Sequence, residues 1–258
     1  MTIQTQTFKA VIFDLDGVIT KTATIHAESW KVMFDEYLHL REEKHKESFV
    51  EFSIKDDYLK YVDGKPRYKG VESFLQSRNI ELTFGSPDDS SDKETICGLG
   101  NQKNVKFIEI LNTKGIDVYE STVRLINELK EAQVRIGIAS SSKNCQFVLQ
   151  TAKLEHLFET RVDGIVSAEL GLKGKPEGDI FVKAAENLGI SPKDAIVVED
   201  ALSGVEAGKN GKFGLVIGLD REGHGNLMKE RGADIVIEDF AGITKKDIEQ
   251  WFQQKNAQ

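Results

Sequence analysis

The chain has 258 residues and a formal net charge of −8, from 34 Lys and Arg against 42 Asp and Glu. Hydrophobic residues make up 40% and charged residues 29%, which fits a folded globular protein and excludes a disordered or collagen-like chain. Because an acidic chain releases no counterions from a phosphate backbone, we expect no nucleic-acid partner.

The cysteines and the apolar runs bear on the compartment of the protein. Cys97 and Cys145 are too few for a disulfide framework, and neither lies in a CxxC pattern. The first seven residues lack the basic and apolar parts of a signal peptide, and no apolar run approaches the length of about 18 residues that a membrane-spanning helix needs. We therefore expect a cytoplasmic monomer with reduced cysteines and no membrane partner.

In chain order, the first predicted element is a buried strand at 10–13. The next stretch differs, because apolar residues such as Trp30 and Phe34 recur among charges with helical spacing and no buried strand follows. Residues 85–92 are rich in Gly, Ser, Pro and Asp, as is typical of an exposed loop. We predict a mainly α-helical insert over 22–117.

The second half alternates short β-branched runs with helix-length segments. Val123, Ile126 and Leu129 illustrate the helical spacing between such runs. This alternation predicts an α/β fold, a Rossmann-like doubly wound parallel sheet built from 1–21 and 118–258 and interrupted by the helical insert. The predicted strands of this half are 134–139, 194–198, 214–217 and 233–237.

Two aspartates directly follow the first predicted strand. In an open α/β sheet, ligands bind at the carboxyl ends of the strands, where Asp14 and Asp16 stand. Neighbouring carboxylates repel each other unless positive charge neutralises them, and Mg²⁺ prefers such oxygen ligands. The spacing allows one aspartate to act as nucleophile and the other as acid–base, although a lone Asp-x-Asp is also typical of a strand-end turn.

Polar residues follow two later strands and precede one helix. Ser140 follows the strand at 134–139, where its hydroxyl could bind a phosphoryl oxygen or cap a helix. Lys175 could neutralise a phosphoryl group, or be a surface lysine in a proline turn. Glu199 and Asp200 end another strand. They could bind a metal or a lysine, or they could cap a helix. Together these residues indicate metal-assisted phosphoryl transfer.

The order Asp-x-Asp, Ser, Lys, Glu-Asp at these positions resembles the haloacid dehalogenase superfamily of phosphotransferases. The match is closest to its β-phosphoglucomutase-like group, which carries a helical cap after the first motif. The resemblance implies that Asp14 forms an aspartyl-phosphate while Asp16 protonates the leaving oxygen and then deprotonates the acceptor. It also implies that Ser140 and Lys175 bind the transferring phosphoryl group. The implied Mg²⁺ ligands are Asp14, Asp16 through its main-chain carbonyl, Asp200, and Glu199 beside them.

Several positions of the insert resemble substrate-binding residues of the same group. His26 resembles a histidine that couples substrate binding to the acid–base, with a helix-surface histidine as the alternative. Arg67 resembles an arginine that binds a distal phosphate, a role that suits its bidentate geometry; a surface loop is the alternative. A solvated helix turn is the alternative for 102–104. The substrate-binding residues implied by the resemblance are Thr22, His26, Arg67, Lys103, Asn104, Ser142, Lys143 and Asn144.

The sequence departs from the mutase pattern at Lys21, where Asp is frequent, at Glu177-Gly178, and in a longer insert around 68–99. An aspartyl-phosphate can pass its phosphoryl group to a sugar hydroxyl or to water, and the cap decides which. We expect a Mg²⁺-dependent phosphotransferase on small phosphosugars, with β-phosphoglucomutase-like isomerisation as the first hypothesis. A phosphosugar phosphatase is the second. A non-catalytic phosphosugar sensor is a remote third, against which the intact catalytic set argues.

Overall fold

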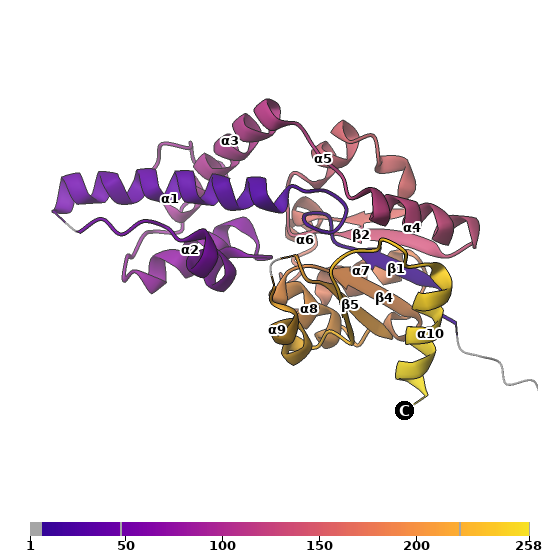
Figure 1. The fold of residues 1–258 in the computed structure, drawn as a ribbon. Helices are drawn as coiled ribbons and strands as arrows, with labels where there is room; N and C mark the ends of the chain where they lie inside the picture. Colours follow the sequence, from indigo (N-terminus) through magenta and orange to yellow (C-terminus); the bar gives the residue numbers. More distant parts are fainter. Residues whose placement is uncertain (1–6, 47, 222, 258) are drawn as a thin grey trace, which may run out of the picture. The chain divides into compact units, whose positions relative to one another are not determined.

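The structure is a computed structural model that describes residues 7–46, 48–221 and 223–257. Contacts divide these residues into two compact units, and Figure 1 labels many of their elements. The first unit combines the described residues up to Lys21 with those from Asp117 onward, and the second spans Thr22–Ile116. The chain re-enters the first unit one residue before the expected position 118. No helix in the described ranges is both long and apolar enough to cross a membrane.

Among the described residues, a six-stranded parallel sheet forms the centre of the first unit. The strand order β3-β2-β1-β4-β5-β6 confirms the predicted Rossmann-like doubly wound sheet. β3 escapes sequence prediction because its three residues, Thr160, Arg161 and Val162, include one apolar side chain, so no apolar run marks it. The strands are β1 (Ala10–Phe13), β2 (Arg135–Ala139), β3 (Thr160–Val162), β4 (Ala195–Glu199), β5 (Leu215–Leu219) and β6 (Ile235–Ile237).

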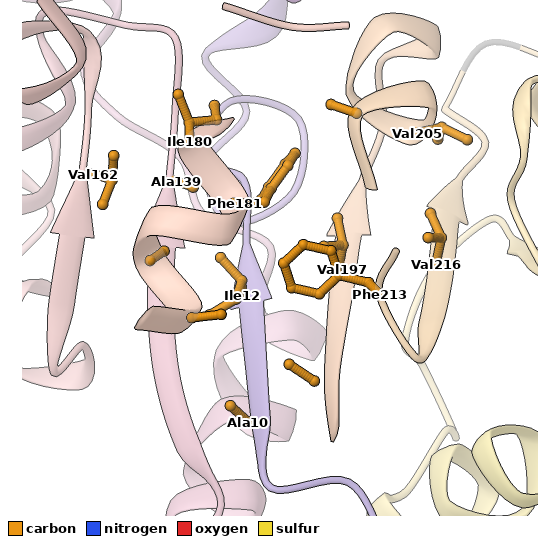
Figure 2. Close-up of a cluster of buried hydrophobic side chains, with 14 of the residues drawn as sticks. Ala10, Ile12, Ala139, Val162, Ile180, Phe181, Val197, Val205, Phe213 and Val216 are labelled. Carbon is orange, nitrogen blue, oxygen red and sulfur yellow. The ribbon is translucent and has the colours of Figure 1, made fainter. Parts of the chain in front are cut away.

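Helices cover both faces of this sheet. On one face, Ile12 and Val197 pack with Phe181 and Phe213 in the apolar cluster of Figure 2. On the other face, α4 contacts β2 and α10 contacts β5. Each fully buried side chain of this size contributes about 1.5–3 kcal/mol, so the strand ends rest on a rigid base. The helices are α4 (Glu120–Glu131), α5 (Cys145–Thr151), α6 (Gly164–Glu169), α7 (Asp179–Asn187), α8 (Leu202–Asn210), α9 (Gly225–Arg231) and α10 (Lys245–Asn256), with 3₁₀ turns η2 (Glu155–Leu157) and η3 (Pro192–Asp194).

The second unit is mainly helical, as the sequence predicts. Its core is aromatic: the ring of Phe34 lies 4.1 Å from that of Phe74 and 5.1 Å from that of Phe52, measured between centroids. Residues 85–92 form a mostly exposed loop between two helices, again as predicted. The elements of this unit are α1 (Ala23–His45), the π-helix η1 (Ile54–Val62), α2 (Arg67–Ser77) and α3 (Ile96–Lys114).

Candidate active site

The parallel register brings the predicted residues of the first unit to one edge of the sheet. Phe13 of β1 pairs with Ile138 of β2 and with Val198 of β4, so the three strands end at the same level. The Asp14 amide extends this ladder by donating to the Val198 carbonyl at 3.0 Å. The predicted positions at this edge are Asp14, Ser140, Glu199 and Asp200.

Lys175 joins two of these carboxylates. Its ammonium lies 2.5 Å from Asp14 Oδ1 and also donates to Glu199 Oε1. The side chain comes from the loop before α7, with Nζ 5.1 Å from the ring centroid of Phe181. Only 4% of Lys175 is exposed, which excludes the surface-lysine interpretation. An ammonium can be buried here because two carboxylates compensate for its lost hydration.

The charges at this edge are not balanced. Burial raises the pKa of Asp14 to about 8. Lys175 acts to lower this pKa, while the charges of Glu199 and Asp16 act to raise it. Burial acts to lower the pKa of Lys175, but its contacts with Asp14 and Glu199 outweigh burial and raise it. The Lys175 ammonium thus contacts two carboxylates, and the charge of Asp16 acts on Asp14 as well, so a cationic ligand would favour the charged form of Asp14.

Gly17 lets the chain turn directly after Asp16. Its φ is +82°, in the left-handed region that glycine adopts without steric penalty, and its amide donates to the Thr20 carbonyl at 2.7 Å. A Cβ at this position would lie only 1.7 Å from Asp200 Oδ2. The Asp200 carboxylate therefore lies against the main chain at Gly17, one residue from Asp16.

Glu199 faces Lys175 and the start of α8. Its Oε2 accepts a hydrogen bond of 2.6 Å from the amide of Ala201, and a Cβ at Gly204 would lie 1.7 Å from its Oε1. The fully buried carboxylate thus occupies space that exists because residue 204 is glycine. Glu199 is therefore the second carboxylate that holds the Lys175 ammonium.

A metal ion at this edge of the sheet would need both side-chain and other oxygen ligands. Across the ranges that the structure describes, no three His, Cys, Asp or Glu side chains form a group that could hold a metal ion. A cation here would therefore need main-chain or substrate oxygens besides the carboxylates of Asp14 and Asp200. The carbonyl of Asp16, which the sequence also singles out, is such a main-chain donor.

The loop after β2 is held together by its serines. Ser140 Oγ accepts from the Ser142 amide at 3.1 Å, and Ser142 Oγ accepts from the Asn144 amide at 3.1 Å. Ser140 is almost fully buried, whereas Ser142, Lys143 and Asn144 are half-buried. Neither bond caps α5, whose N-cap residue Asn144 has no side-chain cap hydrogen bond, so the alternative of a helix-capping Ser140 is wrong. The Ser140 hydroxyl accepts from an amide inside the loop and can still donate its own hydrogen to another oxygen.

Arg67 and Asn104 lie together in the second unit. Arg67 begins α2, and its Nη2 donates to Asn104 Oδ1 of α3 at 2.7 Å. Burial lowers the pKa of Arg67, but an arginine stays charged at neutral pH. Because the bonded partner is a neutral amide, this contact orients the guanidinium without compensating its positive charge.

His26 and Lys103 form a second pair in this unit. Lys103 Nζ lies 2.5 Å from His26 Nδ1, and because an ammonium only donates, Nδ1 must be the acceptor. Lys103 is 3% exposed and lies 5.2 Å from the ring centroid of Trp30, while the His26 ring stacks on Phe107 at 4.2 Å. These contacts exclude a solvated helix turn at Lys103 and a surface position for His26. Thr22 is buried at the start of α1.

Sequence reasoning misses three residues that shape the first unit's site. Phe181 lies beside the Lys175 ammonium, and Gly204 makes space for a carboxylate, as described above. Arg221 donates from Nε to the Gly17 carbonyl at 3.0 Å. Its position just after the carboxyl end of β5 is a signal that could have identified Arg221. The other two become neighbours of the site only through tertiary packing.

Gly17→Ala should abolish turnover, and the backbone strain of alanine at this position should not account for that loss. Alanine in a left-handed conformation costs about 1–2 kcal/mol, and its Cβ would also displace the Asp200 carboxylate. Gly189→Ala is the matched control, because Gly189 has a φ of +67° and no atom within 4 Å of an added Cβ. We expect urea unfolding to show a loss of stability in both variants and phosphate-ester turnover to fail only for Gly17→Ala. Equal turnover in the two would contradict the contact with Asp200.

Most of the chain is similar to proteins of one family. The family model of haloacid dehalogenase-like hydrolases matches residues 8–212. A β-phosphoglucomutase of Mycobacterium bovis is 45% identical over 238 residues, which cover 91% of both chains. A β-phosphoglucomutase of Bacillus subtilis is 32% identical over 246 residues, covering 95% of this chain and 96% of the relative. The crystal structure of a Clostridium difficile β-phosphoglucomutase has the same fold, with a TM-score of 0.76, 22% identity and coverage of 97% of this chain and 100% of that one.

Proposed function

Because the chain belongs to the haloacid dehalogenase-like hydrolase family, we propose that it transfers phosphoryl groups on small phosphosugars as a β-phosphoglucomutase-like isomerase. The observation that carries the proposal is the buried ammonium of Lys175, held between Asp14 and Glu199 at the carboxyl edge of the sheet. Relatives named β-phosphoglucomutase support conversion of a β-hexose 1-phosphate to the hexose 6-phosphate.

Asp14 is the nucleophile in this proposal. One of its carboxylate oxygens bonds to the phosphorus of the sugar phosphate, the bond from phosphorus to the sugar oxygen breaks, and an aspartyl-phosphate forms. Asp16 donates a proton to the departing sugar oxygen. In the second half of the reaction, Asp16 takes a proton from the sugar hydroxyl that accepts the phosphoryl group, and the Asp14 carboxylate is restored.

We assign a divalent cation, Mg²⁺, to this edge of the sheet. Burial, with smaller contributions from Glu199 and Asp16, raises the pKa of Asp14, and a cation would offset this cost to the charged form. The position of the Asp200 carboxylate against Gly17 is the second support. Asp14, Asp200 and the main-chain carbonyl of Asp16 would hold the cation, and Glu199 would contribute by holding Lys175. When bound, Mg²⁺ neutralises the carboxylates and polarises the phosphoryl oxygens.

Lys175 and Ser140 bind the transferring phosphoryl group in this proposal. An ammonium has three N–H donors, and the contacts with Asp14 and Glu199 use two of them, which leaves one for a phosphoryl oxygen. The Ser140 hydroxyl can donate its hydrogen while it accepts from the Ser142 amide. Fixed donors of this kind stabilise the charge that develops on the phosphoryl oxygens in the transition state.

The second unit and the loop after β2 would bind the rest of the substrate. We assign the phosphate that is not transferred to Arg67, with further contacts from Lys103, Asn104 and His26. The loop residues Ser142, Lys143 and Asn144, and the buried Thr22, belong to the same proposal. A phosphosugar phosphatase is the alternative, since only the exclusion of water separates isomerisation from hydrolysis.

Arg67→Ala should weaken substrates with a distal phosphate much more than simple phosphate esters. A charged hydrogen bond contributes about 1.5–3 kcal/mol, so we expect KM for a hexose bisphosphate to rise about tenfold to a hundredfold. KM for p-nitrophenyl phosphate, which has no distal phosphate, should stay the same. Arg67→Lys keeps the charge but loses the planar fork and should fall between the two. Equal losses on both substrates would show that Arg67 does not bind the distal phosphate.

The proposed function is tested by following both products of one reaction. The protein is incubated with Mg²⁺ and β-glucose 1-phosphate plus a trace of β-glucose 1,6-bisphosphate, and glucose 6-phosphate and free phosphate are measured. Glucose 6-phosphate with little free phosphate supports the mutase. Free phosphate alone from several sugar phosphates would replace it with the phosphatase. Neither product from any phosphate ester would overturn phosphoryl transfer and favour the sensor.

A further inference from the structure

Arg221 follows β5 and contacts separate segments of the first unit. Its Nε donates to the Gly17 carbonyl at 3.0 Å, in the turn after β1. Its Nη1 donates to the Glu238 carbonyl at 2.7 Å and to Asp239 Oδ2 at 3.2 Å, just after β6. The guanidinium carbon lies 3.7 Å from the ring centroid of Tyr119. With 15% of its side chain exposed, Arg221 ties these segments together rather than acting as a solvated surface charge.

The turn after β1 is itself paired with the segment that contains Tyr119. The Tyr119 amide donates to the Ile19 carbonyl at 2.9 Å, and Thr20 forms an antiparallel bridge with Val118. The turn and this segment are therefore joined by main-chain hydrogen bonds. Arg221 contacts the turn through its hydrogen bond to Gly17 and the segment through its stacking on Tyr119.

We propose that Arg221 is a positioning residue that fixes the Asp16–Gly17 turn, so that Asp16 is aimed at the oxygen it protonates. This inference rests on the proposed function, because it takes Asp16 as the acid–base. The Gly17 carbonyl is part of the residue that follows Asp16, so its direction and that of the Asp16 backbone are coupled. A misplacement of about 1 Å at a reacting group can lower the rate about a hundredfold.

An arginine suits this position better than a lysine. One edge of the guanidinium is anchored by Glu238 and Asp239, which directs Nε toward Gly17, while the flat face stacks on Tyr119. A lysine ammonium has neither the planar face nor donors at two fixed angles. Arg221→Lys should therefore restore only part of what Arg221→Met loses.

The test separates positioning of the acid from a general structural role by the choice of phosphoryl donor. Single-turnover phosphorylation of the enzyme is measured with saturating β-glucose 1,6-bisphosphate and with saturating acetyl phosphate. The sugar oxygen needs a proton from Asp16 as it leaves, whereas acetate is a weak base that leaves without one. We expect Arg221→Met to slow phosphorylation by the bisphosphate about tenfold to a hundredfold more than phosphorylation by acetyl phosphate, which needs the main chain of this turn but no proton from the Asp16 side chain.

Arg231→Met is the matched control, because Arg231 pairs with Glu206 and has 56% of its side chain exposed. It should leave both rates unchanged. Equal slowing of both donors by Arg221→Met, or no slowing of either, would overturn the positioning role. If the wild-type protein is phosphorylated by neither donor, the proposed function itself fails, and that result is distinct from both outcomes of the variant.

Discussion

Asp14→Asn should abolish phosphoryl transfer, with a loss of at least about 10⁴-fold in kcat, because an amide cannot replace a carboxylate as nucleophile. The fold should persist, since asparagine has nearly the same shape and Lys175 keeps Glu199 as its partner. Asparagine also carries no charge to desolvate at a position where burial opposes the charged form. The measurement is turnover of a sugar phosphate, with urea unfolding to confirm the fold.

Asp88→Asn is the control for this variant, because Asp88 lies in the exposed loop between α2 and α3. It should keep wild-type turnover. An Asp14→Asn protein that unfolds like wild type and still turns over at a near-normal rate would overturn the assignment of the nucleophile.

Lys175→Met should remove activity and also destabilise the fold. Lys175 is 4% exposed, and its loss leaves Asp14 and Glu199 facing each other without the positive charge between them. Breaking a buried ion pair by removing one partner costs about 3–5 kcal/mol. We expect this loss in the free energy of unfolding in urea, together with a loss of turnover. Unchanged stability would show that the three side chains are not packed together.

Two further variants separate these effects. The double variant Lys175→Met with Glu199→Gln removes one carboxylate as well, so it should regain part of the stability but none of the activity. Lys183→Met removes a partly exposed lysine that pairs with Glu186 at 3.6 Å, and such a surface pair contributes at most about 1 kcal/mol. A Lys183→Met variant as unstable as Lys175→Met would show that burial is not the cause.

The sheet and its catalytic edge can be predicted because their signals are local. Residues 10–13 and 195–198 are continuous apolar runs, and the residues after them, such as Asp14 and Glu199, are acidic. Parallel strands end at one edge, so their neighbours in space follow from the fold class. β3 shows the limit, because its residues Thr160, Arg161 and Val162 include one apolar side chain and so leave no apolar pattern, whereas the other edge strand, β6, is an apolar run.

The contacts of the site cannot be predicted in the same way, because they join distant residues. The contact between Lys175 and Glu199 depends on the path of the loop before α7. The need for glycine at 204 depends on where that carboxylate lies. The position of Arg221 just after β5 marks it as a candidate, but its four contacts with residues far away in the sequence follow only from the fold.

The most direct test of this account is to locate the phosphoryl group on the protein. Wild-type protein is mixed briefly with Mg²⁺ and acetyl phosphate, quenched in acid, digested with pepsin and examined by mass spectrometry. The account predicts one phosphoryl group, on Asp14, in wild-type protein and none in Asp14→Asn. A phosphoryl group on any other residue, or a substrate turned over while Asp14 is never phosphorylated, would contradict it.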